Sequence, residues 1–244
     1  MNSERKFAQV RDDEKRMAER RQAERERVFK SYVKNLGLKE EDFAVGKIIL
    51  DVGAGRFANF ADKTRQMNLG CQVVSLDRGE FADTSFDGID QKQNLKIGGT
   101  DFENLNLKEK LGLKQEPQFD LIVSHSSAPY TIANEEDQVF IDERGVAREN
   151  LELLRQKVGA TVESALRHLK PGGRAVFYPV FKSEVVDFGN KNGGRRDFRA
   201  WRKALETALK ELIQAADNDY IFYFEDIKTE NKHIYQRLTI IRKT

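Results

Sequence analysis

The sequence predicts an α/β fold built on a mostly parallel sheet. An apolar run at 47–52 leads directly into Gly53-Ala54-Gly55, which is typical of a buried parallel strand followed by a tight glycine turn. Strand and helix patterns alternate through the middle of the chain, as they do in βαβ units. The last two strand patterns, 220–224 and 234–241, have no helix between them, so we expect them to pair antiparallel.

Length and composition limit the class of protein. With 244 residues and 28.1 kDa, the chain has room for one α/β domain with a full core. The formal net charge of +2 gives no overall basic field. A single cysteine, Cys71, excludes an internal disulfide and a cysteine-based metal site, and we predict no metal. No apolar run approaches the roughly 20 residues that span a bilayer, and the N-terminus has no signal-peptide core, so we expect a cytoplasmic protein.

The first 36 residues are expected to form a charged helical extension, separate from a domain at 37–244. Residues 3–30 contain no glycine or proline and are rich in strong helix formers. An apolar face at helical spacing appears only at the end of this stretch. The helix should therefore project at its N-terminal end, pack on the body at its C-terminal end, and stop at Gly37. The face consists of Val28, Phe29, Tyr32, Val33 and Leu36.

The charge on this helix leaves its role open. Residues 1–35 contain eleven Lys and Arg against seven Asp and Glu. One interpretation is a solvated capping helix, which is the usual meaning of a charge run. The other is a basic arm that binds RNA or an acidic partner, although the interleaved acids weaken it.

A helix and a second strand follow the glycine turn. We predict the helix at 57–67 and the strand at 71–77, which ends in Asp77. Asp77 lies 22 residues after Gly55, and in a βαβ unit an acid at this distance accepts from the ribose hydroxyls of a bound nucleotide. The alternative is an Asp that caps a helix or a turn. The helix residues expected to face inward are Phe57, Phe60 and Ala61.

The loop after a short third strand at 94–97 carries an acid next to an aromatic residue. The carboxylate of Asp101 would accept from the exocyclic amine of an adenine, and the ring of Phe102 would pack on the base. In the alternative, Thr100 or Asp101 caps a helix at 102–111.

A fourth strand at 118–124 runs into the polar cluster 125–130. In open α/β sheets, ligands bind at this carboxyl edge of the strands. The remaining elements are a helix at 148–169, a turn at 170–173, a strand at 174–180 and a helix at 198–216. The buried stripe of the first of these helices is expected to consist of Leu151, Leu154, Val158, Val162, Ala165, Leu166 and Leu169.

Four segments carry a family pattern: Ile49-Leu50-Asp51-Val52-Gly53-Ala54-Gly55, Val74-Ser75-Leu76-Asp77, Phe119-Asp120-Leu121-Ile122-Val123-Ser124 and Leu169-Lys170-Pro171-Gly172-Gly173-Arg174. In this order, with the closing strand pair, they resemble the class I S-adenosylmethionine-dependent methyltransferases. The resemblance marks 37–244 as a methyltransferase domain. It implies a Rossmann-like three-layer sandwich of seven strands in the order 3-2-1-4-5-7-6, with an antiparallel last strand, and S-adenosyl-L-methionine as cofactor.

Asp51 separates this cofactor from a dinucleotide. A dinucleotide enzyme presents the same Gly-x-Gly-x-x-Ala string, here Gly53 to Ala58, to a pyrophosphate. Placing Asp51 beside that group would cost about 1–4 kcal/mol in like-charge repulsion. The ammonium and sulfonium of S-adenosylmethionine instead attract a carboxylate. A purely structural Asp51 that caps the glycine turn is the alternative.

The predicted cofactor site gathers residues from four strand ends. They are Asp51, Gly53, Ala54, Gly55, Phe57, Asp77, Arg78, Asp101, Phe102 and Ser124.

Two residues of the polar cluster are candidates for catalysis. Methyl transfer is a displacement in which the protein mainly aligns the reactants, and alignment supplies about 7–11 kcal/mol. A general base is needed only if the acceptor must lose a proton, and His125 is the candidate, with a hydrogen-bonded loop histidine as the alternative. Tyr130 is expected to stack on or steer the acceptor. The segment Ser127-Ala128-Pro129-Tyr130 departs from the Pro-Pro-aromatic motif of amide and base N-methyltransferases, so that specificity is not carried over.

Three functions follow as hypotheses. The first is an active methyltransferase whose acceptor, a small molecule or RNA, is unidentified. The second is an inactive protein of the same fold that binds RNA or a protein partner through the N-terminal helix. The third is a NAD-dependent enzyme, which Asp51 and the lack of a substrate domain disfavour.

Overall fold

The strands of the protein form one large sheet and one small pair. The structure is a computed structural model that describes residues 3–81, 94–129, 139–141, 147–182, 198–215, 219–230 and 233–244. The large sheet contains β1 Ile48–Val52, β2 Gln72–Leu76, β3 Asn94–Ile97, β4 Phe119–His125, β7 Leu169–Lys182, β8 Tyr220–Lys228 and β9 Ile234–Arg242. The small pair consists of β5 Val139–Ile141 and β6 Ala147–Glu149.

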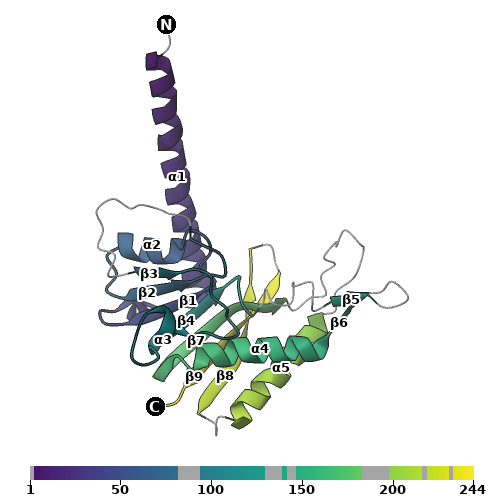
Figure 1. The fold of residues 1–244 in the computed structure, drawn as a ribbon. Helices are drawn as coiled ribbons and strands as arrows, with labels where there is room; N and C mark the ends of the chain where they lie inside the picture. Colours follow the sequence, from purple (N-terminus) through teal and green to yellow (C-terminus); the bar gives the residue numbers. More distant parts are fainter. Residues whose placement is uncertain are drawn as a thin grey trace.

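The large sheet has the predicted topology. Its strands lie in the order β3-β2-β1-β4-β7-β9-β8, and β1 to β4 and β7 run parallel (Figure 1). β9 is antiparallel to both of its neighbours, β7 and β8. Since β5 and β6 stand outside this sheet, the seven strands follow the order 3-2-1-4-5-7-6. The long closing pair forms because no helix intervenes between β8 and β9 to carry the chain back.

Helices cover both faces of the sheet and make three layers (Figure 1). α1 and α2 pack on one face, and α4 and α5 pack on the other. The helices are α1 Ser3–Leu36, α2 Asn59–Gln66, α3 Leu107–Lys110, α4 Leu151–Leu166 and α5 Phe198–Ala215, with a short 3-10 helix at Glu40–Phe43.

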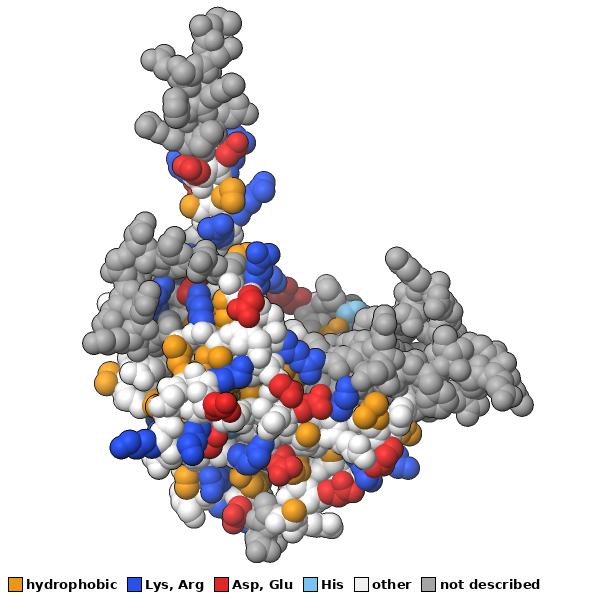
Figure 2. Space-filling model, viewed as in Figure 1, with side chains coloured by type: hydrophobic (Ala, Val, Ile, Leu, Met, Phe, Trp, Pro, Cys, Tyr) orange, Lys and Arg blue, Asp and Glu red, His pale blue; other side chains and the backbone are white. Residues whose placement is uncertain are grey.

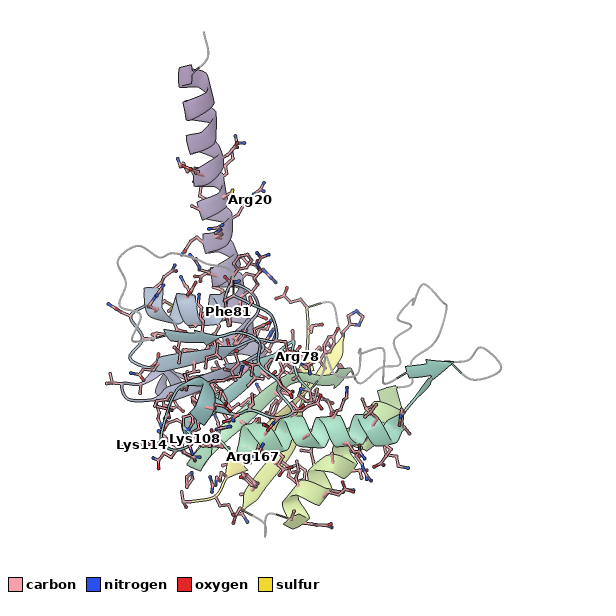
Figure 3. The ribbon with its side chains drawn as sticks, viewed as in Figure 1. Arg20, Arg78, Phe81, Lys108, Lys114 and Arg167 are labelled. Atoms are coloured by element: carbon pink, nitrogen blue, oxygen red, sulfur yellow. The ribbon has the colours of Figure 1, made fainter. Side chains whose placement is uncertain are left out.

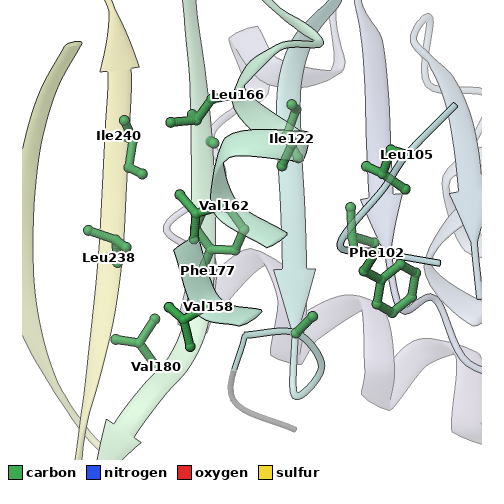
Figure 4. Close-up of a cluster of buried hydrophobic side chains, with 14 of the residues drawn as sticks. Phe102, Leu105, Ile122, Val158, Val162, Leu166, Phe177, Val180, Leu238 and Ile240 are labelled. Atoms are coloured by element: carbon green, nitrogen blue, oxygen red, sulfur yellow. The ribbon is translucent and has the colours of Figure 1, made fainter. Parts of the chain in front are cut away.

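The larger core lies between the sheet and the α4–α5 layer. Figure 4 shows Val158, Val162 and Leu166 of α4 pointing onto the sheet. They meet Phe177 and Leu238 there, and all five side chains are buried. Burying side chains of this size stabilises the fold by about 1.5–3 kcal/mol each. The α4–α5 layer therefore fixes the sheet, and with it the positions of the strand ends.

α1 joins the second core only through its C-terminal part. Phe29, Tyr32 and Leu36 are buried against the sheet, whereas residues 13–24 are exposed on a helix that projects from the body (Figure 1). Gly37 ends the helix in a left-handed conformation, with φ +61°. The guanidinium of Arg237 takes the place that a side chain at Gly37 would need, and it donates to the carbonyl of Asn35 across 3.2 Å. The prediction for this helix is confirmed.

Two expected inward residues face solvent instead. Phe57 is 42 % exposed because α2 begins only after Ala58, which is itself left-handed with φ 45°. Leu151 is 44 % exposed because α4 begins at this residue. Its cap, Asn150, accepts from the backbone amide of Leu153 across 3.2 Å.

Two other boundaries also differ from the prediction. The helix expected at 102–111 is the four-residue α3, because Phe102 and Leu105 are drawn into the core before the chain turns helical. The turn expected at 170–173 lies within the long β7, where the pairing with β4 shifts register. The side chain of Trp201 and the segments 130–138 and 183–197 lie outside the described residues.

Candidate functional site

The glycine turn after β1 (Ile48–Val52) is fixed by the end of β2 (Gln72–Leu76). The backbone amides of Gly53 and Ala54 both donate to the carbonyl of Leu76, across 2.8 and 2.9 Å. Gly53 and Gly55 have φ of +74° and +72°, which glycine adopts without strain. Nothing described lies within 4 Å of a side chain built at Gly55. At Gly55, the turn therefore presents bare backbone to an open space.

The carboxylate of Asp77 fixes this turn by accepting backbone hydrogen bonds. One carboxylate oxygen accepts from the amide of Gly55 across 2.8 Å, and the other accepts from the amide of Gly79 across 3.0 Å. This is the turn role that was the alternative to ribose binding. The two roles are compatible, because a carboxylate has about four acceptor positions and Asp77 is only partly buried.

Asp51 is fully buried beneath the turn. Its Oδ1 accepts from the hydroxyl of Tyr32 across 3.1 Å, and its Oδ2 has no hydrogen-bond partner in the described structure. Burial raises the pKa of Asp51 to about 7; the bond from Tyr32 opposes this shift, and the charge of Asp77 adds to it. Asp51 makes no bond to the turn backbone, so it does not cap the turn as the structural alternative required.

A second buried polar group lies beside Asp51. Ser75 is in register with Asp51 between β1 and β2, and its hydroxyl also lacks a hydrogen-bond partner in the described part of the chain. Parallel strands in register present their side chains on the same face. Unpartnered buried polar atoms are rare in native proteins, and a ligand or an ion commonly explains them. Two of them side by side, next to the glycine turn, make this place the candidate ligand site.

The third strand end lies close to Asp77. The amide of Asp77 donates to the carbonyl of Ile97, and the amide of Thr100 donates to the carbonyl of Asp77. Asp101 is exposed, and its carboxylate accepts from the amide of Glu103 across 2.9 Å, which is a turn-forming bond.

The aromatic residue of this loop is turned into the core. Phe102 is only 3 % exposed, and the guanidinium of Arg78 lies 5.3 Å from the centre of its ring. Arg78 also pairs with Glu103 at 3.9 Å and is labelled in Figure 3. The ring of Phe102 is therefore in contact with the core and with Arg78.

The loop after β4 (Phe119–His125) reaches the glycine turn. A side chain built at Gly53 would overlap the Cβ and Oγ atoms of Ser127. Ser127 therefore touches the turn directly, although it was not among the predicted site residues. Ser124 is buried and donates its hydroxyl to the carbonyl of Ala128, so its side chain closes its own loop.

His125 contacts α1 (Ser3–Leu36). Its Nε2 lies 3.1 Å from Ser31 Oγ and 3.1 Å from Asn35 Nδ2, and its ring stacks on Tyr32 at 4.7 Å. Burial, with a smaller contribution from the positive charge of Arg27, lowers the pKa of His125 to about 4. The geometry is that of the hydrogen-bonded histidine.

The structure gathers part of the predicted site. Asp51, Gly53, Ala54, Gly55 and Asp77 lie together around the turn, whereas Phe57 precedes α2 on the exposed surface. Tyr130 lies outside the described residues. Sequence reasoning missed Ser127 and treated Tyr32 only as a packing residue. No spacing in the sequence marks Tyr32, because its contact with Asp51 depends on how α1 docks.

Other features of the described residues do not compete with this site. A shallow hollow of about 370 Å³ between α4 and α5 is lined by residues such as Gly159, Ala160 and Ala208, in the helical layer on one face of the sheet. No group of His, Cys, Asp and Glu suited to a metal ion occurs in the described part. No helix there is long and apolar enough to cross a membrane.

Comparisons with known proteins identify the fold. No family model and no curated protein matches the sequence. Among solved structures, the protein is similar to the Burkholderia thailandensis 1,6-didemethyltoxoflavin-N1-methyltransferase with bound 1,6-didemethyltoxoflavin and S-adenosylhomocysteine. That match has a TM-score of 0.50 and 15 % identity, and covers 100 % of this chain and 92 % of that chain.

Two further matches are weaker. A putative hemolysin from Lactococcus lactis has a TM-score of 0.46 at 16 % identity, over 87 % of this chain and 84 % of that one. The Bacillus cereus O-methyltransferase in complex with S-adenosylhomocysteine has a TM-score of 0.44 at 16 % identity. That match covers 83 % of this chain and 76 % of that chain. The protein thus has the Rossmann-like fold of the class I S-adenosylmethionine-dependent methyltransferases, as the sequence resemblance implied.

Proposed function

We propose that this protein is an S-adenosylmethionine-dependent methyltransferase. The observation that supports it most directly is Asp51, a buried carboxylate under an open glycine turn with one oxygen unpartnered. An isolated buried charge is costly, and a cationic ligand would compensate it. In the part of the chain that the structure describes, no Lys, Arg or His pairs with Asp51.

The residues around the turn fit this cofactor. Asp51 would receive the ammonium of its methionine part, the bare backbone at Gly55 would lie against it, and Asp77 would accept from the ribose hydroxyls. A pyrophosphate would instead meet two carboxylates, Asp51 and Asp77. When bound, the cofactor supplies a methyl group on an activated leaving group. The fold neighbour with a TM-score of 0.50 has S-adenosylhomocysteine bound.

The protein's own part in the reaction is mainly alignment. Ser127, in the loop after β4, lies against the glycine turn, where cofactor and acceptor would meet. His125 does not act as general base in this proposal, because its Nε2 already accepts hydrogen bonds from α1 and its pKa is about 4. The preferred acceptor is therefore an atom with a free lone pair.

A small molecule is the proposed acceptor class. The described face in Figure 2 shows Lys and Arg interspersed with Asp and Glu, without a basic patch of the kind that RNA binding requires. Of the cations labelled in Figure 3, Arg20 belongs to the projecting α1, whereas Lys108 and Lys114 lie on or just after α3. RNA remains the second acceptor class to be tested.

Calorimetric titration tests the cofactor. S-adenosylhomocysteine and S-adenosylmethionine are expected to bind, and NAD is not. Asp51→Asn should weaken binding by about 30-fold or more, the cost of removing one partner of a buried charge pair. Asp120→Asn is the matched control, since Asp120 pairs with Lys47 and Lys170 at the opposite edge of the sheet and should leave affinity unchanged. No binding of either methionine-derived ligand would overturn the proposal.

Activity is a separate question from binding. Labelled S-adenosylmethionine incubated with fractionated extract should transfer label to the small-molecule fraction. Label in the RNA fraction would instead identify RNA as the acceptor class. Tight cofactor binding without transfer to any fraction would favour the inactive binding protein.

A further inference from the structure

Tyr32 of α1 (Ser3–Leu36) reaches into the proposed cofactor site. Its hydroxyl donates to Oδ1 of Asp51 across 3.1 Å, and the two side chains are only 3 % and 0 % exposed. This bond joins α1 to the end of β1 (Ile48–Val52). It occupies one oxygen of Asp51 and leaves Oδ2 as the unpartnered one.

The hydroxyl is held in place by the packing of its ring. The ring stacks on Phe60 at 4.5 Å with an angle of 13° between planes, and on His125 at 4.7 Å with an angle of 19°. His125 is fixed in turn by Ser31 and Asn35 of the same helix. A ring stacked on two others has little rotational freedom, so its hydroxyl keeps a single direction.

Tyr32 remains a hydrogen-bond donor at all ordinary pH values. Burial, together with the charge of Asp51, raises the pKa of its hydroxyl well above the usual range. A donated hydrogen bond favours the ionised form of a carboxylate. It opposes burial and the charge of Asp77, which both favour the neutral form of Asp51. Tyr32 from α1 and Asp77 after β2 are the titratable groups that face Asp51 in the described structure.

We propose that Tyr32 is a positioning residue of the cofactor site, which orients Asp51 and keeps it ionised for the ammonium of the bound cofactor. The C-terminal part of α1 is then a component of the ligand site as well as a cover on the sheet. This inference rests on the proposed function.

Tyr32→Phe isolates the hydroxyl, because the ring and its stacking partners stay. Without the donor, the midpoint of Asp51 ionisation should move up by about one pH unit, the size expected for a hydrogen bond to a charged group. S-adenosylhomocysteine, titrated by calorimetry from pH 6.0 to 8.0, should therefore bind about ten-fold more weakly to the variant at pH 6.0. The difference should shrink to about two-fold at pH 8.0, where Asp51 is largely ionised in the wild type and about half ionised in the variant.

Tyr178→Phe is the matched control. Tyr178 is also buried and contacts His125 at 5.6 Å, and the structure shows no contact between it and Asp51. Its variant should bind like the wild type at every pH. A Tyr32→Phe deficit of the same size at both pH values would make the hydroxyl merely structural and overturn the inference, as would no deficit at all.

A second measurement uses the unaltered protein. Binding at pH 7.0, followed in buffers of different ionisation enthalpy, should release a fraction of a proton, because Asp51 changes from partly protonated to ionised. Absence of proton release overturns the inference even if Tyr32→Phe fails to fold. Absence of S-adenosylhomocysteine binding to the wild type is a different result, since it removes the proposed function itself.

Discussion

Asn35 of α1 (Ser3–Leu36) donates its side-chain amide to Nε2 of His125, at the end of β4 (Phe119–His125), across 3.1 Å. An amide nitrogen can only donate, so Nε2 is an acceptor and the imidazole is neutral. Burial, which lowers the pKa of His125 to about 4, agrees with this protonation state. The docking of α1 beside the glycine turn therefore depends on an uncharged histidine.

Acid should undo this contact. The folded pKa of about 4 lies below the ordinary 6.5, so His125 stabilises the fold fully above pH 6.5, and this contribution is lost as the pH falls through the folded pKa. The loss between pH 7 and pH 4.5 should be about 2–3 kcal/mol. His125→Gln keeps a hydrogen-bond acceptor but does not titrate. Urea unfolding should show the variant less stable than the wild type at pH 7, with the gap closing by about this amount at pH 4.5. An equal gap at both pH values would contradict the assignment.

Asp51 should act in the opposite direction. Its folded pKa of about 7 lies above the ordinary 3.8, so it favours folding below about pH 4 and loses that contribution as the pH rises through 7. The shift from 3.8 to about 7 corresponds to a change of about 4 kcal/mol in the free energy of unfolding. Asp51→Asn removes the buried charge, so the ligand-free variant should be more stable than the wild type at pH 8 by about 1–3 kcal/mol, with no gain at pH 4. Urea unfolding at both pH values measures this difference.

Asp120→Asn is the control, because it is expected to change stability in the opposite direction. Asp120 accepts from Lys170 across 2.8 Å and from the amide of Ile48 across 3.0 Å. Partial burial raises its pKa, but these bonds and the one from Lys47 outweigh burial, so its pKa is lowered. Its loss should destabilise the protein at pH 8. If Asp51→Asn were also destabilising there, Asp51 would be a structural residue rather than one reserved for a ligand.

The strands of the fold were predictable because their pattern is local. The apolar runs at 48–52, followed by a glycine turn, and at 119–125, followed by a polar cluster, are read over a few residues, and the order of elements supplies the topology. Boundaries set by single caps were not predictable. Ala58, in a left-handed conformation, moved the start of α2 and exposed Phe57, and Asn150 did the same for Leu151.

The site was predictable only in its backbone part. Asp51 and the glycines follow from a contiguous motif. The partner of Asp51 is Tyr32, 19 residues away, and the partner of His125 is Asn35, 90 residues away. Such pairs depend on how a helix docks on the sheet, and periodicity reports only that Tyr32 faces inward.

Gly55 should be needed for ligand approach rather than for folding. Its φ is +72° and nothing described lies within 4 Å of an added side chain, so Gly55→Ala should cost only about 1 kcal/mol of backbone strain. The added methyl would protrude where the cofactor is expected, and S-adenosylhomocysteine should bind about ten-fold or more weakly. Calorimetry and urea unfolding give the two values.

Gly46 provides the matched substitution. It has φ +85°, also with open space around it, but it precedes β1 and so lies at the opposite edge of the sheet. Gly46→Ala should show the same strain and unchanged affinity. Equal affinities for the Gly46 and Gly55 variants would place the ligand away from the glycine turn.

Truncation separates the two parts of α1. Residues 13–20 are exposed, whereas Arg25 pairs with the buried Asp62 at 3.7 Å and Tyr32 holds Asp51. Deleting residues 1–20 should therefore leave the melting temperature and the affinity for S-adenosylhomocysteine unchanged.

The same truncated protein tests whether the projecting part of α1 is a basic arm that binds RNA. Residues 1–20 carry six basic and five acidic side chains, so the deleted stretch offers almost no net positive charge to a phosphate backbone. Fluorescence anisotropy with a single-stranded RNA at 50 and 200 mM salt should show equally weak binding for both lengths. Salt-sensitive binding that the deletion abolishes would instead assign the projecting helix to RNA.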